Sequence, residues 1–288
     1  MDRVVARVLT WYARHARDLP WRRPYASPWG VLVSEVMLQQ TPVARVLPAY
    51  RAWLARWPTP ADLAAEPPGE AVRQWGRLGY PRRALRLHAA ARAITERHGG
   101  TVPRAYDELR ALPGVGAYTA AAVAVFAYLD RHAVLDTNVR RVLARVVCGA
   151  AYPSRAPTAD ERRLAESMLP EDSRMAARWS VAVMELGALV CTSRAPRCDV
   201  CPLTDRCVWQ AAGRPSSGEP PPRQRYAGTD RQARGRLLGV LREAEGPVST
   251  ERLINAWTEP IQRERALGAL IADGLVEPFA DGSYALPS

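Results

Sequence analysis

The sequence predicts an all-α body joined by a linker to a small C-terminal module. Apolar residues recur at three- and four-residue spacing through the first two thirds of the chain, as in Val5, Val8, Leu9 and Tyr12. No alternation typical of a strand occurs before residue 275. Pro, Gly and Ser crowd residues 213–231, which predicts an extended linker. With 288 residues, the chain has room for two domains.

Helix boundaries in the body are marked by prolines and glycines. Pro28 after Ser27 predicts a helix whose first residue is proline and whose cap is serine. A second helix is predicted from Pro81 toward His98, and the pair Gly99-Gly100 is expected to end it. These signals support a succession of helices through the body.

The last part of the chain, residues 232–288, predicts a winged-helix-like module. Three helices are expected, at 232–243, from a cap at Ser249 or Thr250, and at 260–273. Segments 275–279 and 283–286 flank Asp281-Gly282, which indicates a β-hairpin. From Ala227 onward seven Arg face nine Asp and Glu, a net charge of −2. This charge favours a packing role or a protein partner over DNA binding for the module.

The positive charge lies in the body and is carried by arginine alone. The chain has a net charge of +11 and no lysine, so residues 1–226 carry about +13. A basic domain suggests a polyanionic partner, and the guanidinium fork suits phosphate. The alternative is compositional, because a lysine-free chain must use arginine on every solvated face. The longest apolar run, 120–129, is too short to span a membrane.

Four cysteines, at Cys191, Cys198, Cys201 and Cys207, form a C-x6-C-x2-C-x5-C run. Thiolates clustered in one short segment predict a metal centre. Disulfides are the poorer interpretation, because the chain shows no secretory signal and a reducing cytoplasm is expected. A cubane iron–sulfur cluster is favoured over zinc, whose structural sites usually use two separated Cys-x-x-Cys pairs. Cys148 follows an apolar helical stretch and is expected in the core.

The segment Leu112-Pro113-Gly114-Val115-Gly116 separates two predicted helices, the second beginning near Tyr118. Its glycines let the backbone approach a ligand, and the following helix N-terminus adds partial positive charge. The segment therefore predicts a phosphate-binding turn, with an ordinary helix-to-helix connection as the alternative.

Glu35 is a candidate general acid. Its helical neighbours Val31, Leu32 and Leu38 place the carboxyl on a largely apolar face. We expect desolvation to raise its pKa, so that it is protonated near neutral pH. The alternative is a glutamate tolerated at the edge of the apolar stripe.

Asp136 is a candidate anionic partner for that acid. It precedes a predicted helix beginning near Val139, so it is expected to cap the helix and stay ionised. Capping alone explains the residue. A neutral acid paired with a charged carboxylate is also the arrangement that cleaves glycosidic bonds.

Together these segments resemble the MutY-type adenine DNA glycosylases of the helix-hairpin-helix superfamily, from about residue 5 to residue 210. The matching blocks are Leu19-Pro20-Trp21, Ser34-Glu35-Val36-Met37-Leu38-Gln39-Gln40-Thr41, Leu78-Gly79-Tyr80, Leu112-Pro113-Gly114-Val115-Gly116, Leu135-Asp136 with Asn138-Val139, Met184-Glu185-Leu186-Gly187 and the four cysteines.

The resemblance implies two helical domains, a helix-hairpin-helix motif and a loop that binds a 4Fe–4S cluster. The implied boundaries are 22–128 for a six-helix domain with the hairpin, 1–21 with 129–212 for the cluster domain, 213–231 for the linker and 232–288 for the module. It also implies a monomeric, cytoplasmic, nucleoid-associated protein that binds double-stranded DNA containing an adenine mispair. A protein partner for the module stays open.

The resemblance further implies roles for individual residues. Adenine opposite 8-oxoguanine or guanine would be flipped out of the duplex and its N-glycosidic bond hydrolysed. Catalysis would use Glu35 as the acid, Asp136 to stabilise the sugar cation and Tyr118 to support it. Substrate would be bound by Trp21, Arg22 and Glu185 around adenine and by Gln40, Thr41 and Tyr80 near the opposite base. DNA contacts would come from Leu112, Gly114, Val115, Gly116, Arg194 and Arg197, and also Arg206.

Packing stays an alternative role for Trp21 and Tyr80, and a plain ion pair stays one for Glu185.

Two departures from the family concern specificity. The chain has Pro81 where many members have a second tyrosine, and its last residues show no likeness to the Nudix-related domain of longer members. Discrimination of the opposite base would then depend on Gln40, Thr41 and Tyr80.

Two other functions are weighed. A pyrimidine or thymine mismatch glycosylase of the same superfamily would share Tyr118 and Asp136 but lack the block around Glu35. A non-catalytic iron–sulfur DNA-binding regulator would bind without regard to mispairs. Because lyase-type relatives attack the sugar with a lysine at the place of Tyr118, the lysine-free sequence excludes that activity.

Overall fold

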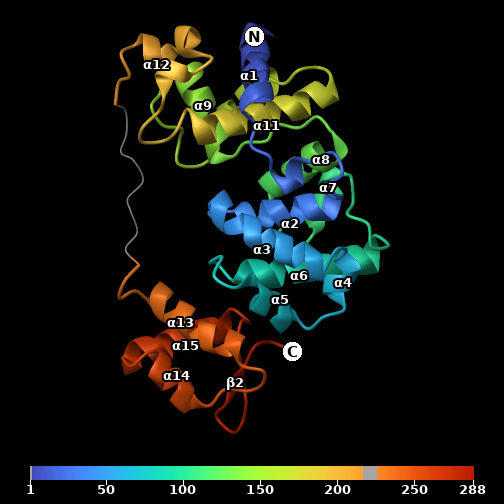
Figure 1. Ribbon diagram of the computed structural model, residues 1–288, viewed down its shortest axis with the longest axis vertical. Coiled ribbons are helices and arrows are strands. Elements are labelled where there is room, and N and C mark those ends of the chain that lie inside the picture. The colour runs from blue at the N-terminus through green and yellow to red at the C-terminus, as the bar shows by residue number, and fades with distance from the viewer. Residues whose placement is uncertain (1, 217–225) are drawn as a thin grey trace. The chain divides into compact units, whose positions relative to one another are not determined.

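The computed structural model describes residues 2–216 and 226–288 (Figure 1). The chain forms two compact units. Unit 1 comprises Met1–Ala26, Arg104–Arg110 and Gly116–Pro222, and unit 2 comprises Ser27–Pro103, Ala111–Val115 and Arg223–Ser288. The described residues are mostly helical, which confirms the predicted class. The predicted domain boundaries stay a prediction, and most of the predicted linker lies outside the described residues.

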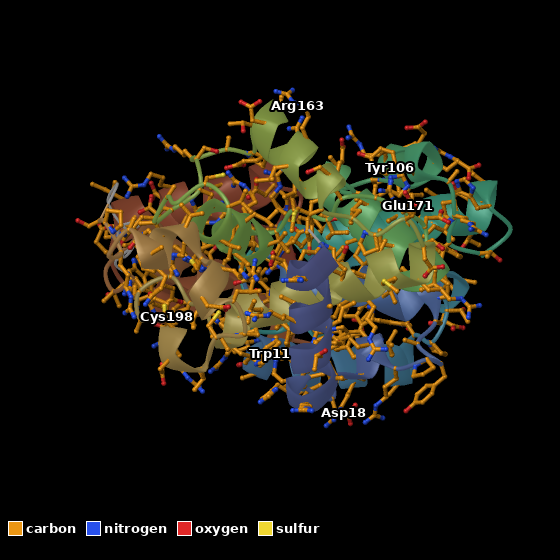
Figure 2. The ribbon with its side chains drawn as sticks, turned by 90° about the horizontal axis from the view of Figure 1, so that it is seen from above. Trp11, Asp18, Tyr106, Arg163, Glu171 and Cys198 are labelled. Carbon is orange, nitrogen blue, oxygen red and sulfur yellow. The ribbon has the colours of Figure 1, made fainter. Side chains whose placement is uncertain are left out.

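Unit 1 packs its first helix and a later helix against one long helix. Its elements are α1 (Asp2–His15), η1 (Pro20–Arg22), most of α7 (Tyr106–Ala111), α8 (Ala117–Tyr128), α9 (Thr137–Val146), α10 (Ala159–Ser167), α11 (Ser173–Leu189), η2 (Cys198–Val200), η3 (Thr204–Arg206) and α12 (Val208–Ala211). Helices α1 and α9 both pack on α11. The resulting core contains Val8, Trp11, Val142 and Leu186, of which Trp11 on α1 is labelled in Figure 2.

Side-chain caps fix where the helices of unit 1 begin. Asp136 caps α9 by accepting from Val139 N, as predicted, and Asp172 caps α11 in the same way. Thr158 and Glu161 form a capping box at the start of α10. The cap on α9 holds the Asp136 carboxylate against the first turn of that helix.

The body of unit 2 consists of packed helices, the first of which is buried along almost its whole length. Its elements are α2 (Pro28–Leu38), α3 (Val43–Arg56), α4 (Pro60–Ala64), α5 (Pro68–Trp75) and α6 (Arg82–Arg97). Ser27 caps α2 through Gly30 N at 3.1 Å, with Pro28 at its first position, as predicted. Every residue from Trp29 to Met37 is buried. Helix α2 is therefore a core element, without a solvated face.

The C-terminal module also belongs to unit 2. It consists of α13 (Asp230–Glu243), α14 (Thr250–Ala256), α15 (Pro260–Ala272), β1 (Glu277–Pro278) and β2 (Tyr284–Ala285). The strands pair antiparallel, with Glu277 opposite Ala285 and Pro278 opposite Tyr284. Gly282 has φ +81, so it supplies the left-handed residue that the predicted turn needs. The three-helix and hairpin pattern predicted from sequence is confirmed. Within the described residues, no helix is long and apolar enough to cross a membrane.

Candidate active-site and metal-centre residues

Glu35 lies in the middle of α2 and is 5 % exposed. The carboxyl is therefore held in an interior formed largely by apolar side chains, among which Val31, Leu32 and Val36 are also buried. The buried position is the one that the sequence predicted. Burial of a carboxyl in general disfavours its charged form, and a proton held by Glu35 near neutral pH stays a prediction.

Asp136 is held by donors at the N-terminus of α9. Its Oδ1 accepts from Val139 N at 2.6 Å, and its Oδ2 accepts from Asn138 Nδ2 at 2.7 Å. Burial nevertheless raises the pKa of Asp136, and these hydrogen bonds and the Arg141 charge offset only part of that effect. The predicted cap is present, and desolvation is the largest of the effects on this carboxyl; its ionised state stays a prediction.

A chain of hydrogen bonds runs from Asp136 toward the cysteine segment. Asn138, which donates to Asp136, accepts at Oδ1 from Arg141 Nη2 at 2.7 Å. Arg141 Nε donates to the Cys191 carbonyl at 2.7 Å, and its Nη2 donates to the Gly187 carbonyl at 2.7 Å. Sequence reasoning missed Arg141. The available signal was its position three residues after Asn138 on the same helix face.

Tyr118 and the predicted phosphate-binding turn follow one another along the chain. Gly114 has φ +76, and a Cβ there would lie 2.6 Å from Arg86 Cβ, so the position requires glycine. Val115 N donates to the Leu112 carbonyl at 3.1 Å, and Leu112 and Val115 are buried. Gly116 precedes α8 as its N-cap, with open space beside it, so its backbone is accessible to a ligand. Tyr118 packs in the first turn of α8 against an apolar cluster in unit 1.

Trp21, Arg22 and Glu185 come together within unit 1. Trp21 is 6 % exposed and Glu185 is fully buried. Arg17 donates to both Glu185 oxygens at 2.7 Å, and Arg22 Nη1 lies 2.9 Å from Oε2 as an ion pair without hydrogen-bond geometry. Burial alone would raise the pKa of Glu185, but the Arg17 hydrogen bond and the Arg22 charge lower it overall. Glu185 is thus an ion-pair partner, and its contact with adenine stays a prediction.

Gln40, Thr41 and Tyr80 are gathered within unit 2 on two loops that one arginine joins. Arg83 Nη2 donates to Thr41 Oγ1 at 3.0 Å and to the Gly79 carbonyl at 2.9 Å. Its Nη1 donates to three carbonyls at the end of α2, those of Val36, Met37 and Gln39. Burial lowers the pKa of Arg83 to about 10. Sequence reasoning missed this residue, which holds both loops in place.

Gln40 and Tyr80 share an unusual backbone. Their φ angles are +54 and +48, a region that side-chain-bearing residues rarely adopt. Gln40 is exposed, and Tyr80 is 42 % exposed. Such strain is kept only where the surroundings fix it, and it is concentrated at functional sites. Both side chains are presented outward from the loops that Arg83 fixes.

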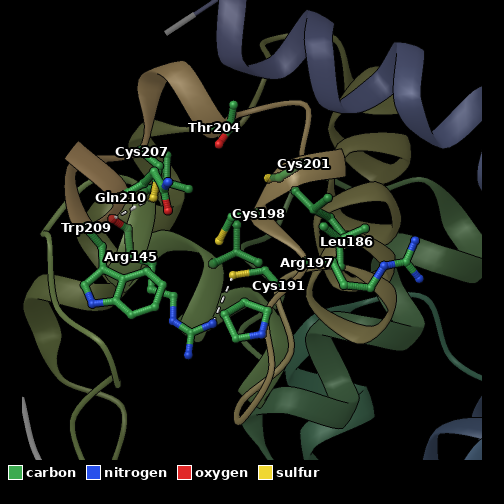
Figure 3. Close-up of a pocket in the computed structure, with 14 residues that line it drawn as sticks. Arg145, Leu186, Cys191, Arg197, Cys198, Cys201, Thr204, Cys207, Trp209 and Gln210 are labelled. Carbon is green, nitrogen blue, oxygen red and sulfur yellow. Dashed lines mark hydrogen bonds between the residues drawn. The ribbon is translucent and has the colours of Figure 1, made fainter. Parts of the chain in front are cut away.

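The four cysteines line one pocket (Figure 3). Val142, Val146, Leu186 and Val190 supply apolar walls, so the sulfur atoms face an interior with few competing ligands. Burial raises the pKa of Cys201 to about 11, and that of Cys207 is also raised. No group of three or more His, Cys, Asp or Glu among residues 2–216 and 226–288 has the geometry to hold a metal ion. Support for a thiolate-bound metal cluster therefore comes from the shared pocket and the all-sulfur donor set, and not from a preformed ligand geometry.

Arginines surround this centre. Arg145 is 1 % exposed; it donates to Cys191 Sγ at 3.4 Å and to the Thr192 carbonyl at 2.8 Å. Arg194 and Arg197 are exposed, as the prediction of phosphate contacts requires. Cys148 is exposed, so the expectation of a core position was wrong. It lies two residues beyond the end of α9, next to Val147, which is 40 % exposed.

Relatives named adenine DNA glycosylase or thymine-DNA glycosylase match from 69 % to 97 % of this chain. Adenine DNA glycosylase of Mycolicibacterium smegmatis is 54 % identical over 280 residues, which is 97 % of this chain and 94 % of the relative. Human adenine DNA glycosylase is 41 % identical over 213 residues, which is 69 % of this chain and 38 % of the relative. Thymine-DNA glycosylase of Aeropyrum pernix is 34 % identical over 207 residues, covering 70 % of this chain and 92 % of the relative.

Solved structures agree on the fold. A thermostable thymine-DNA glycosylase superposes with a TM-score of 0.65 at 28 % identity, covering 73 % of this chain and 95 % of that one. An endonuclease III–DNA covalent intermediate superposes with a TM-score of 0.62 at 22 % identity, covering 73 % and 94 %. A family model described as HhH-GPD superfamily base excision DNA repair protein matches residues 33–166. The chain therefore belongs to the MutY-type adenine DNA glycosylases of this superfamily and is an enzyme of that type.

Proposed function

We propose that this enzyme flips adenine mispaired with 8-oxoguanine or guanine out of double-stranded DNA and hydrolyses its N-glycosidic bond. The observation that carries the proposal is the burial of Glu35, which is only 5 % exposed and lies in a helix with no solvated face. A protonated carboxyl in such a place can give its proton to the leaving base. The 54 % identity to adenine DNA glycosylases supports adenine as that base.

The chemistry divides between two carboxyls. Glu35 protonates the adenine ring, which makes the base a better leaving group. The Asp136 carboxylate, held by Val139 N and Asn138, stabilises the positive charge that develops on the sugar. Tyr118 supports that charge. Because the chain has no lysine, no Schiff base forms on a lysine side chain and the product is an abasic site without strand cleavage.

The positions of the remaining residues support the proposed substrate contacts. Trp21, Arg22 and Glu185 form a pre-arranged cluster that suits the adenine pocket. Gln40, Thr41 and Tyr80, on the loops that Arg83 joins, are placed to enter the duplex next to the opposite base. The turn from Leu112 to Gly116 and exposed Arg194 and Arg197 contact the phosphate backbone. We therefore expect DNA binding that weakens steeply as salt is added.

We also propose that Cys191, Cys198, Cys201 and Cys207 bind a 4Fe–4S cluster. Their common pocket supports this assignment. The cluster would fold the cysteine segment and so present Arg194 and Arg197 to DNA. Purified protein should be brown and contain iron and sulfide, whereas a colourless zinc-containing preparation would contradict the assignment. We expect a monomer in the cytoplasm, associated with the nucleoid.

The test is a duplex assay of Glu35→Gln beside the unsubstituted enzyme. The variant keeps the shape of the side chain but has no proton to donate, so we expect adenine release to fall 10²–10⁴-fold. Glu96→Gln is the matched control in the same unit, because Glu96 is exposed and forms a surface ion pair with Arg92. Equal rates for Glu35→Gln and the unsubstituted enzyme would refute the proposal.

The same assay separates the other functions. Release of thymine from a thymine–guanine mispair, with adenine left intact, would support the mismatch thymine glycosylase that the 28 % identical structure represents. Binding that is equal on matched and mispaired duplexes, without base release, would support a regulator.

A further inference from the structure

The C-terminal module is attached to the body of unit 2 by reciprocal backbone contacts. Arg73 on α5 donates to the carbonyls of Arg242 and Ala244, the latter at 2.7 Å. In return Arg242 on α13 donates from Nε to the Val72 carbonyl at 2.9 Å. Gly69 N donates to the Pro287 carbonyl at 2.8 Å. A Cβ on Gly69 would lie 2.4 Å from that carbonyl oxygen, so the contact is tight.

A second set of contacts brings the module to the loop that carries Tyr80. Asp273, at the end of α15, pairs with Arg82 at 3.1 Å and also with Arg234 of α13. Arg82 begins α6 and is two residues from Tyr80. The ion pair therefore fixes the N-terminal end of α13 beside the entry to α6.

Arg231, in the first turn of α13, lies over the Tyr80 ring. Its guanidinium carbon is 4.9 Å from the ring centroid, and that of Arg83 is 5.6 Å from the same centroid. A Cβ on Gly79 would lie 3.8 Å from Arg231 Nη2. Among the residues that the structure describes, the Arg231 guanidinium has no hydrogen bond and no ion pair; its contacts are with the rings of Tyr80 and Tyr226.

A cation over an aromatic face is attracted by the quadrupole of the ring. Tyr80 thus has an attractive contact with the buried Arg83 and a second one with Arg231, while 42 % of its surface stays open. Without these contacts an exposed tyrosine would sample several rotamers, and fixing one of them would cost conformational entropy each time the protein bound DNA. Two guanidinium contacts reduce that cost before DNA arrives.

We propose that Arg231 is a positioning residue: the C-terminal module uses it to hold the Tyr80 ring ready to enter the duplex. This inference depends on the proposed function and deepens it, because it gives the module a part in handling the opposite base. Arg231 acts through Tyr80. Packing on α5, or binding of a protein partner, would not by itself require that the module place the Arg231 guanidinium over the Tyr80 ring.

The test is a double-mutant cycle between Arg231→Ala and Tyr80→Ala, with kcat/KM for adenine release as the readout. With Tyr80 present, Arg231→Ala should lower kcat/KM about fivefold, mainly through kcat. In the Tyr80→Ala background the same change should have less than a twofold effect. Arg231→Lys keeps the cation and should recover part of the loss. Arg236→Ala, on the same helix and exposed, is the control and should leave the rate unchanged.

Two outcomes would overturn the inference. One is an unchanged rate for Arg231→Ala. The other is an equal loss of kcat/KM on Arg231→Ala with and without Tyr80, if that loss comes from a higher KM and becomes smaller as salt is added. This result would mean that Arg231 binds phosphate directly. Thermal unfolding of the same four proteins without DNA measures the contact itself. If the enzyme releases no adenine but the effects of the two substitutions on thermal stability are still non-additive, the proposed function is refuted while the contact between Arg231 and Tyr80 is supported.

Discussion

Asn138→Ala probes the ionisation of Asp136. The asparagine donates a 2.7 Å hydrogen bond to Asp136 Oδ2, and the alanine variant removes it while Val139 N still caps the other oxygen. The lost bond stabilises the ionised carboxylate, so its loss should raise the pKa of Asp136 beyond the increase that burial already causes. Arg141 loses an acceptor as well, but keeps the Cys191 and Gly187 carbonyls.

The size of the effect follows from the charge on the acceptor. A hydrogen bond to a charged group contributes about 1.5–3 kcal/mol, and the lower end applies because Val139 N still donates to the other oxygen. At about 1.4 kcal/mol for each pKa unit, the acid limb of activity should shift upward by about one unit. Because the lost bond acts on the ionised form, the destabilisation should be about 1.5 kcal/mol above the pKa and should shrink as pH falls below it.

The assay is kcat/KM for adenine release across pH, with urea unfolding at neutral and acidic pH. Asn255→Ala is the control, because Asn255 is exposed in the C-terminal module. An acid limb that stays in place or moves downward would refute the reasoning. A destabilisation that is equal at both pH values would show that Asn138 acts by packing and not through the charge of Asp136.

Three further predictions concern the supports of the site. Arg83→Lys should lower the free energy of unfolding, measured in urea, by about 3 kcal/mol, because an ammonium cannot donate to both loops and buried carbonyls lose their donors. An unchanged free energy of unfolding would contradict this. Gly114→Ala should cost about 1–3 kcal/mol and weaken duplex binding, because of its φ of +76 and the clash with Arg86. Cys198→Ser should lower bound iron and sulfide, whereas Cys148→Ser, at an exposed position, should leave both unchanged.

The residues that sequence identifies are those with a local signature. Asp136 precedes a helix and Glu35 lies among apolar neighbours, so cap and burial follow from the adjacent sequence. The turn at Gly114 is recognisable because glycine is the residue that tolerates its backbone. Helix class, caps and the C-terminal hairpin were predictable for the same reason.

The residues that sequence missed act over long separations. Arg83 donates to Thr41, 42 residues earlier, and Arg141 donates to the Cys191 carbonyl, 50 residues later. An arginine in a basic chain carries no local sign that its acceptors are backbone carbonyls elsewhere. The increase in the pKa of Asp136 was not foreseen for a related reason, because its local hydrogen bonds are visible in sequence while the burial that outweighs them is tertiary.

The buried arginines give this lysine-free protein a particular chemical behaviour. Arg83, Arg140, Arg141 and Arg145 are all buried, and each donates to groups from distant segments. An ammonium desolvated in this way can lose its proton near neutrality, whereas guanidinium stays charged. These internal crosslinks should persist through neutral pH, and that of Arg83 should weaken only near pH 10, because burial lowers its pKa to about 10. Reagents that acylate side-chain amines will find no target within the sequence, so fluorophores are better attached through a thiol such as that of Cys148.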